Sequence, residues 1–411
     1  MNTREIRRII ERQKSGWTLE LPFYVSPEIY EIERNTYLSE QWHIVGHISE
    51  VPRPGTHIVR TLLGQSLIIL RDNEEVLRCL HNVCTHRGCR LVDHDGCTSG
   101  GFVCPYHAWS FRLDGSLKSA VGLPDDANTG TLGLRQASIR SIGGIILVSM
   151  RADPAELDGI ERRLLGLLHH HGIPSARIAA RHKYSMRANW KLVIDNFLEC
   201  YHCYPVHPEI CAIRSSVAVQ GRVATEETIN KWTRLVTQWS DEEADPSSPV
   251  PISSTEILFE LDVLDVYRIP IGKGFKTESR DGSPVAPLMG KVKRYDGGST
   301  GFCVQPFIYY TCCSDHAVLF QFDPAGLEQT DLTLTWLVDG SANEESVDLD
   351  ALTWMWDVTT KQDKEIIEKN FDGIRSMSYR PGPYSSLENL SSQQTSRYLS
   401  YLTRECEVPE K

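Results

Sequence analysis

Four cysteine and histidine side chains occur as two short pairs in the first part of the sequence. The first pair is Cys84 and His86, within Cys-Thr-His-Arg-Gly, and the second is Cys104 and His107, within Cys-Pro-Tyr-His-Ala-Trp. Two thiolates on one iron and two imidazoles on the other can hold a two-iron, two-sulfide cluster. We therefore expect Cys84 and Cys104 to bind one iron of such a cluster, and His86 and His107 to bind the other.

A structural zinc ion is the alternative for two cysteines and two histidines. The spacing argues against zinc, because a zinc finger normally pairs Cys with Cys and His with His, whereas each pair here contains one of each. The two segments resemble the Rieske signature, including the Arg-Gly after the first histidine and the Pro-Tyr-His-x-Trp of the second half. The resemblance implies a Rieske [2Fe-2S] domain.

A second group of potential metal ligands follows later in the chain. On a continuous helix, Asp195, Glu199 and His202 would share one stripe. Pro205 could end or bend that helix, so that His207 converges with His202. Two histidines and one carboxylate form the facial triad of non-haem iron(II), which leaves positions open for dioxygen.

The carboxylate of this triad should come from another segment, because Asp195 and Glu199 are better placed behind the histidines than opposite them. A long helix predicted from about Leu349 to Phe371, with the residue that follows it, offers five carboxylates, and spacing alone does not choose among them. They are Asp357, Asp363, Glu365, Glu368 and Asp372.

The order of the two motifs resembles the catalytic subunits of Rieske non-haem iron oxygenases over nearly the whole chain. In that family the third iron ligand lies in a Gln-Asp-x-x-Ile-x-Glu pattern, which the sequence matches from position 362 to 368, so the resemblance implies Asp363. The family also places a bridging carboxylate three residues before the first histidine, between a cluster imidazole and an iron imidazole. That position is Glu199, and Asp195 stays open as a second catalytic carboxylate.

The resemblance implies the cofactors and partners as well: a [2Fe-2S] cluster, mononuclear Fe(II), and O2 as co-substrate. The chain has no Gly-x-Gly-x-x-Gly motif after a predicted strand, so NAD(P)H should bind a separate flavin and iron-sulfur reductase. In the family, electrons cross between the subunits of a homotrimer. The path would run from His107 of one subunit to His202 or His207 of the next, through Glu199.

The nearest resemblance is to the glycine betaine, proline betaine, carnitine and choline monooxygenases. It rests on Glu-Cys-Tyr-His-Cys, the Gln-Asp helix and the Pro-Gly-Pro-Tyr-Ser motif at 381–385. It implies hydroxylation of an N-methyl group of a quaternary amine or betaine, with release of formaldehyde. The alternative is an aromatic-ring-hydroxylating dioxygenase.

A pocket for a quaternary ammonium should rely on aromatic faces. The sequence does not rank the candidates, and it singles out no Arg or Lys for a substrate carboxylate. The aromatic candidates are Phe197, Tyr204, Trp232, Trp239, Tyr267, Phe307, Tyr309 and Tyr310.

The length of 411 residues and the 41% hydrophobic content predict a protein of two or three domains. We expect an α+β fold with a helical arm over 1–41 that packs on the catalytic domain, and a small all-β Rieske domain over 42–150. The catalytic domain over 151–411 should be an antiparallel sheet with covering helices, of the helix-grip type. A simple electron-transfer protein would not need this last part.

The net charge of −11 disfavours nucleic acid as a partner. The sequence lacks a long apolar run and an apolar signal segment, so we expect a soluble cytoplasmic protein that does not enter a membrane. The twelve cysteines are then expected to be reduced. The polar, acidic stretch 224–254 is expected to be an exposed insertion.

Overall fold

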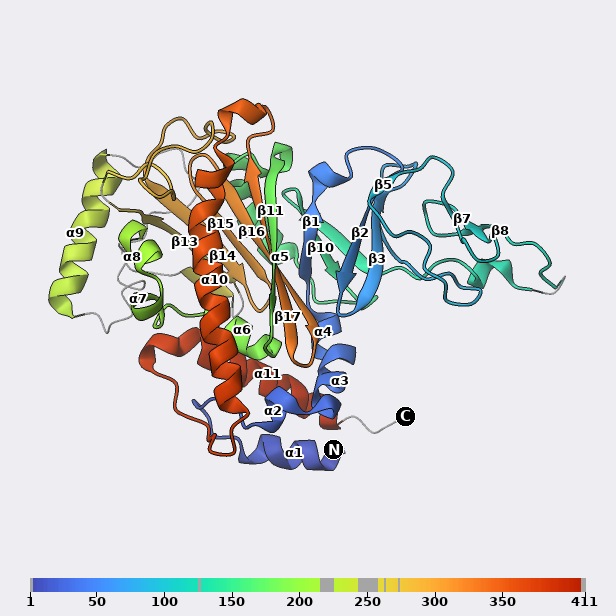
Figure 1. The fold of residues 1–411 in the computed structure, drawn as a ribbon, viewed down its shortest axis with the longest axis horizontal. Coiled ribbons are helices and arrows are strands. Elements are labelled where there is room, and N and C mark those ends of the chain that lie inside the picture. The colour runs from blue at the N-terminus through green and yellow to red at the C-terminus, as the bar shows by residue number, and fades with distance from the viewer. Residues whose placement is uncertain are drawn as a thin grey trace. The chain divides into compact units, whose positions relative to one another are not determined.

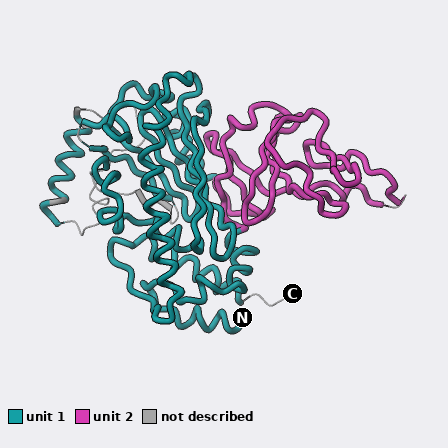
Figure 2. Tube along the Cα trace, viewed as in Figure 1, with its two compact units in different colours: residues 1–38, 158–411 teal, residues 39–157 magenta. Residues whose placement is uncertain are grey.

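The structure is a computed structural model that describes residues 3–124, 127–214, 225–242, 258–261, 264–272 and 274–407. The chain divides into two compact units (Figure 2). One unit is residues 39–157, and the other combines residues 1–38 with residues 158–411. Within the described ranges, no helix has both the length and the apolar character needed to cross a bilayer.

The unit of residues 39–157 is built from short antiparallel strands in three small sheets. The first sheet has the order β1-β10-β9, the second β4-β3-β2-β5 and the third β6-β7-β8. The strands are β1 (His43–His47), β2 (Thr56–Leu62), β3 (Gln65–Arg71), β4 (Leu77–His81), β5 (Gly96–Cys97), β6 (Phe102–Val103), β7 (Ser110–Phe111), β8 (Leu117–Ser119), β9 (Ser138–Ile142) and β10 (Ile145–Ser149).

The hairpin of β3 and β4 leads directly to the first Cys/His pair. The side chain of Asp72 closes the turn, because its Oδ1 accepts hydrogen bonds from the amides of Glu74 and Val76, both at 2.9 Å. The apolar side chains of both strands enter one core, which also takes up Cys84, Cys104 and Trp109. The two cysteines are therefore held by the packed interior of this unit.

The other unit contains one antiparallel sheet of the order β11-β17-β16-β15-β14-β13-β12. Helices cover this sheet, which confirms the expected α+β fold class. The strands are β11 (Arg177–Met186), β12 (Leu258–Leu261), β13 (Leu264–Pro270), β14 (Gly298–Val304), β15 (Ile308–Cys312), β16 (Ala317–Gly326) and β17 (Gln329–Val338).

The long helix predicted from about Leu349 is present as α10 (Leu349–Ile374) and crosses one face of the sheet (Figure 1). Its N-terminus is capped by Asp348, whose Oδ1 accepts a hydrogen bond from the amide of Ala351 at 3.0 Å. One stripe of α10 is buried and includes Trp356 and Asp363. The other α-helices that the structure describes in this unit are α1 (Thr3–Arg12), α2 (Pro22–Val25), α3 (Pro27–Asn35), α5 (Asp158–His170), α6 (Trp190–Phe197), α7 (Cys203–Val206), α8 (Pro208–Ile213), α9 (Glu226–Glu242) and α11 (Asn389–Glu407). The short helix α4 (Tyr37–Glu40) begins in this unit and ends in the unit of residues 39–157.

A buried ionic network ties the N-terminal segment to α6 and α11. The carboxylate of Glu33 on α3 accepts hydrogen bonds from Lys191 Nζ at 2.7 Å and Trp190 Nε1 at 2.9 Å. The hydroxyl of Tyr398 on α11 donates to the same carboxylate. Glu33 is fully buried, and Lys191 is 4% exposed. This network fixes the start of α6, the helix that leads into the second group of ligands.

Two expectations about local structure were wrong. The helix that begins at Asn189 does not run through the histidines, because α6 ends at Phe197 and the chain turns before α7. The acidic stretch is not simply an exposed insertion, since residues 226–242 form α9, which buries Trp232, Val236 and Trp239. The rest of that stretch lies outside the described residues, apart from Thr225.

Candidate functional site

The two loops that carry the first Cys/His pairs have the same hydrogen-bond pattern. The amide of Gly88 donates to the carbonyl of Cys84 at 2.9 Å, and the amide of Ala108 donates to the carbonyl of Cys104 at 3.0 Å. A residue shortly after each histidine has a positive φ. It is 78° at Gly88, two residues after His86, and 58° at Ala108, directly after His107. The two loops thus share one backbone conformation, which brings the Cys and the His of each loop to the same side of the loop.

The side chains of these loops are brought together in an arrangement that fits a cluster. The rings of His86 and His107 lie 4.7 Å apart, and His86 stacks on Trp109 at 4.6 Å. Cys84 and Cys104 are each only 2% exposed, whereas both histidines are exposed. A cluster held here would have a buried thiolate-bound iron and an accessible imidazole-bound iron, which suits electron exit through the histidines.

The surroundings of the two thiols shift their pKa values in opposite directions. Burial raises the pKa of Cys84. At Cys104, hydrogen bonds from the amides of Tyr106 and His107 outweigh burial and lower the pKa. A third thiol, Cys89, interacts with Cys104 from the same loop region and was not singled out from the sequence.

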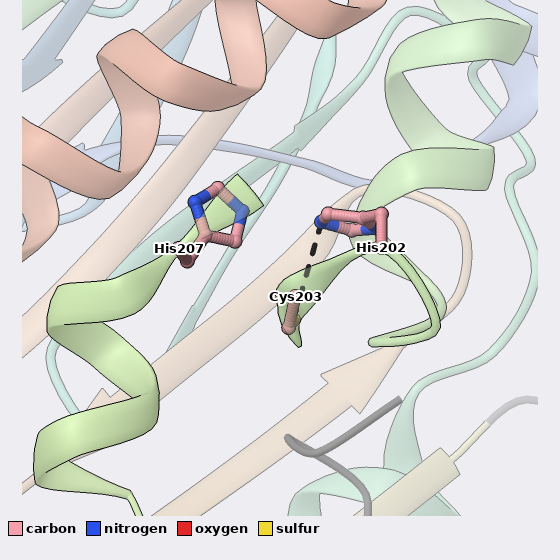
Figure 3. Close-up of side chains that lie close together, drawn as sticks. All are labelled: His202, Cys203 and His207. Atoms are coloured by element: carbon pink, nitrogen blue, oxygen red, sulfur yellow. Dashed lines mark hydrogen bonds between the residues drawn. The ribbon is translucent and has the colours of Figure 1, made fainter. Parts of the chain in front are cut away.

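The second group of ligands lies where α6 gives way to two short helices. Glu199 lies in the turn after α6, where its Oε2 accepts hydrogen bonds from the amides of Tyr201 and His202. His202 then precedes α7, and His207 lies between α7 and α8 (Figure 3). The two histidines flank α7, which contains Pro205 and ends at Val206, so a helical segment does end between them as expected.

His202, His207 and Asp363 meet at one point. Asp363 Oδ1 lies 2.9 Å from His207 Nε2 and 3.3 Å from His202 Nε2. Neighbouring ligands of an octahedral ion with bonds of about 2.1 Å are about 3.0 Å apart. The three side chains therefore fit three adjacent positions of one ion.

The second ring nitrogen of each histidine is also held. His202 Nδ1 lies 2.6 Å from Glu199 Oε1, and His207 Nδ1 lies 2.8 Å from Gln362 Oε1. These contacts turn both Nε2 atoms toward Asp363, as outer partners of metal-bound histidines do. Desolvation lowers the pKa of His202, but its bonds to Asp363 and Glu199 outweigh that effect and raise the pKa to about 9.

Asp195 occupies a different place from Glu199. Its Oδ2 accepts a hydrogen bond from the hydroxyl of Tyr384 at 3.2 Å, and its own helix is packed against α11. Burial raises the pKa of Asp195 to about 7. The structure thus brings Glu199 to His202, whereas the side chain of Asp195 on α6 faces Tyr384.

The other carboxylates of α10 and its vicinity are engaged elsewhere. Asp357 accepts a hydrogen bond from Tyr184 and Asp372 pairs with Arg187. Glu365 pairs with Lys369 on the surface, and Glu368 accepts from the amide of Arg187. Of the five carboxylates that spacing left open, Asp363 is the one that faces the histidines.

The expectation that all cysteines are reduced was wrong for one pair. Cys200 and Cys203 form a disulfide with Cα atoms 4.9 Å apart, because the turn after α6 brings these two positions together. Cys203 Sγ lies 4.0 Å from His202 Nε2, the contact drawn in Figure 3. Since this sulfur is bonded to Cys200, the Asp363 oxygen is the better third ligand.

Several of the expected aromatic residues lie on the sheet face that α6 and α10 cover, which we call the inner face. Phe197 of α6 contacts Tyr309 at 6.3 Å between ring centroids, and Trp356 of α10 contacts Phe320 at 4.9 Å. Tyr267 also lies on the inner face, because strand pairing and alternation align it with Thr311 and Tyr309.

The remaining aromatic candidates have other environments. Trp232 and Trp239 are buried on α9, Phe307 packs on Trp190, and Tyr310 stacks on Phe302. Tyr204 is 54% exposed. Phe197, Tyr267 and Tyr309 are thus the expected aromatics that the structure places between α6, α10 and the sheet.

Family models match both units of the chain. A model of the catalytic domain of ring-hydroxylating alpha subunits matches residues 174–404, and a model of the Rieske [2Fe-2S] domain matches residues 41–130. The chain belongs to the Rieske non-haem iron oxygenase alpha subunits. The prediction made from the two motifs is thereby confirmed.

Among curated relatives, the glycine betaine monooxygenase oxygenase subunit of Chromohalobacter salexigens is 32% identical over 390 residues, covering 91% of this chain and 83% of the relative. The carnitine monooxygenase oxygenase subunit of Acinetobacter baumannii is 35% identical over 205 residues, 47% of this chain and 53% of the relative. The quaternary ammonium Rieske monooxygenase CntA, solved with gamma-butyrobetaine, has a TM-score of 0.68 at 22% identity, covering 96% of this chain and 98% of CntA. This last likeness concerns the fold.

As a Rieske oxygenase, the chain works with a [2Fe-2S] cluster, mononuclear iron(II) and dioxygen, and receives electrons from a reductase. The sequence motifs contain two further side chains near His202 and His207 to which the sequence assigned no role. Gln362 belonged to the quoted pattern, but its role at His207 depends on the direction of the side chain. Asn196 begins the pattern Asn-x-x-Glu-x-Tyr-His, but its place 3.4 Å from His202 Nε2 likewise depends on the direction of the side chain.

Proposed function

We propose that this oxygenase hydroxylates an N-methyl group of a quaternary ammonium or betaine substrate. One methyl group, dioxygen, two electrons and two protons would give a hydroxymethyl ammonium and water. Loss of formaldehyde and a proton from the hydroxymethyl group leaves the demethylated tertiary amine. The electrons originate from NAD(P)H and arrive through a separate flavin and iron-sulfur reductase.

The convergence of His202, His207 and Asp363 is the observation that carries the proposal. We assign these three side chains as the iron ligands, and Cys84, His86, Cys104 and His107 as the cluster ligands. When bound, the cluster supplies electrons and the mononuclear iron activates dioxygen. Gln362 orients His207, and its own Nε2 is held by Glu209 at 2.9 Å.

Glu199 has the role of a bridging carboxylate in this proposal. Its Oε1 holds His202 Nδ1, which fixes the direction of the ring and stabilises an imidazole proton at that nitrogen. An oxygenase with this bridge receives its electrons across a subunit boundary, so we propose a homotrimer. His107 of one subunit would then face Glu199 of the next.

The substrate class is supported by the relatives and by the inner face. Three relatives named as glycine betaine monooxygenase oxygenase subunits match more than nine-tenths of this chain. Tyr267 and Tyr309 lie on the inner face beneath α6 and α10, where aromatic faces could receive a quaternary ammonium.

The test is a substrate screen with a surrogate reductase. We expect formaldehyde and a demethylated amine from glycine betaine or a related quaternary amine, in step with oxygen uptake. A matched variant, His207→Ala, should abolish formaldehyde while the reductase still reduces the cluster. Formation of a cis-diol from an aromatic acid, without formaldehyde from any quaternary amine, would contradict the proposal.

A further inference from the structure

A buried guanidinium lies on the inner face of the sheet. Arg214 Nε lies 2.7 Å from Glu278 Oε1, and its Nη2 donates to Ser299 at 3.2 Å and Thr311 at 3.0 Å. The side chain of Arg214 is 8% exposed and that of Glu278 is 1% exposed. The guanidinium also lies 5.0 Å from the ring of Trp356.

Two helices place this guanidinium at a defined distance from the iron ligands. His207 and Arg214 flank α8 at its two ends, and on α10 Asp363 follows Trp356. Asp363 and Trp356 are seven positions apart on α10, by subtraction of the residue numbers, so they lie on one side of that helix and about 10 Å apart. The six-residue helix α8 separates His207 from Arg214. His207 contacts Asp363 at one end, and Arg214 contacts Trp356 at the other.

The hydrogen bonds of the Arg214 guanidinium to Glu278, Ser299 and Thr311 do not use all of its nitrogen atoms. The contacts to Glu278, Ser299 and Thr311 use Nε and Nη2, and Nη1 takes part in none of them. Tyr267 also hydrogen-bonds to the same guanidinium, and this bond and the charge of Arg214 partly offset the effect of burial in raising the pKa of that hydroxyl. An arginine held on one edge by fixed partners can present its other edge to a carboxylate.

We propose that Arg214 binds the carboxylate of the substrate on the inner face, at the other end of α8 from His207. This inference rests on the proposed function and narrows its substrate class to quaternary amines that carry a carboxylate. The anionic end would receive a charge-assisted bond from Arg214 Nη1 and a second one from the hydroxyl of Tyr267. The cationic end would then point along α8 and α10 toward His207 and Asp363.

Glu278 pairs with Arg214, so the site is not a free positive charge that would bind any anion. A buried arginine without a partner is costly, and the ion pair with Glu278 offsets that cost before any substrate binds. Glu278 Oε2 is buried without a hydrogen-bond partner among the described residues, so this corner of the inner face stays polar. A trimethylammonium compound that lacks a carboxylate would leave the available donors unpaired.

The experiment compares glycine betaine with choline, which share the trimethylammonium group and differ in the carboxylate. For the wild-type holoenzyme we expect a preference in kcat/KM for glycine betaine. Arg214→Gln should lower the ratio of kcat/KM for glycine betaine to that for choline by about 10- to 100-fold, the value of one lost bond to a charged group, mainly through KM. Arg214→Lys keeps the positive charge but not the planar guanidinium, so its ratio of kcat/KM should lie between those of the wild type and Arg214→Gln.

Iron content, labile sulfide and thermal midpoint of each variant control for folding. If Arg214→Gln does not fold, Ser299→Ala removes one partner of Nη2 without leaving a charge unpaired, and a smaller loss in the same ratio is expected. An equal loss for both substrates in a folded variant would make Arg214 a structural residue and overturn the inference. The proposed function would survive that result.

Calorimetric binding separates the two proposals further. If the wild type released no formaldehyde from any quaternary amine, the proposed function would fail. Binding of glycine betaine would still test Arg214, since we expect affinity at least about 10-fold weaker in Arg214→Gln. Equal binding by both proteins would overturn the inference on its own.

Discussion

At the scale of single residues, each histidine of the proposed iron site is held at both ring nitrogens. Nε2 faces Asp363, while Nδ1 is held by Glu199 at His202 and by Gln362 at His207. An imidazole constrained in this way presents a single lone pair in one direction, so the site is shaped before a metal binds.

Glu199→Gln tests the bridging carboxylate. The amide can still bond to His202 but carries no charge, so we expect turnover to fall by about 10- to 100-fold while mononuclear iron is retained. The measurements are formaldehyde release and the rate of cluster reoxidation by dioxygen in the presence of substrate. Glu365→Gln, a change in an exposed carboxylate of α10, is the matched control. Unaltered reoxidation in Glu199→Gln would argue against the bridge.

The raised pKa of Asp195 predicts how stability depends on pH. Because the folded pKa is about 7 and the ordinary value is 3.8, the folded state binds the extra proton between these limits. Stability should therefore fall as pH rises from about 4 to 7, by at most about 4 kcal/mol from this group. Asp195→Asn should remove that dependence, so that the variant gains in thermal midpoint over the wild type at pH 8 and not at pH 4.5. If the thermal midpoints of the two proteins changed with pH in the same way, the prediction would be contradicted.

At the scale of elements, the position of α6 depends on the N-terminal segment and on α11. Glu33, Lys191 and Tyr398 join α3, α6 and α11 in the interior. Because α6 leads directly into the turn with Glu199 and His202, the network helps to fix the position of His202, the first proposed iron ligand.

Breaking this network on one side should be costly. Lys191→Met leaves the carboxylate of Glu33 buried without its cation, and we expect a loss of about 3–5 kcal/mol in the free energy of unfolding. The double variant Glu33→Gln with Lys191→Met removes both charges and should recover a large part of that loss. Denaturant unfolding measures both. A double variant as unstable as the sum of the single changes would show that the ion pair is not the source of the effect.

At the scale of the whole molecule, the proposal requires two metal centres in one chain and electron transfer between chains. The cluster ligands belong to the unit of residues 39–157, and the iron ligands belong to the other unit. Each centre should therefore be removable without loss of the other. Cys84→Ser should lose labile sulfide and the visible absorption of the cluster, whereas His207→Ala should keep both and lose only the mononuclear iron.

Mixed trimers test the direction of electron transfer. His107→Ala subunits lack a cluster ligand and His207→Ala subunits lack an iron ligand, so neither should be active alone. If electrons cross between subunits of a cyclic trimer, co-expression in equal amounts should restore about a quarter of wild-type turnover. Turnover that stays at the level of the single variants, in trimers shown to be mixed, would place the transfer within one chain.

Local sequence determined the most about the first site and the least about the second. Cys84, His86, Cys104 and His107 lie in two loops whose short spacing already brings each Cys beside its His, so the chemistry was readable before any fold. The α+β class and α10 followed from strand and helix patterns that depend on neighbouring residues.

Only the tertiary structure chose between residues far apart in the chain. Spacing left five carboxylates open and the family resemblance implied Asp363, but only the tertiary structure brings Asp363 and Glu199 to His202 and places Asp195 at Tyr384. It also pairs Cys200 with Cys203 across a turn that the sequence did not predict. It also brought Arg214 to Trp356 and Thr311, although no pattern marked this arginine. The reason is physical: spacing tells which residues share a face of one element, but the direction of a side chain across a packed interface depends on the elements that meet there.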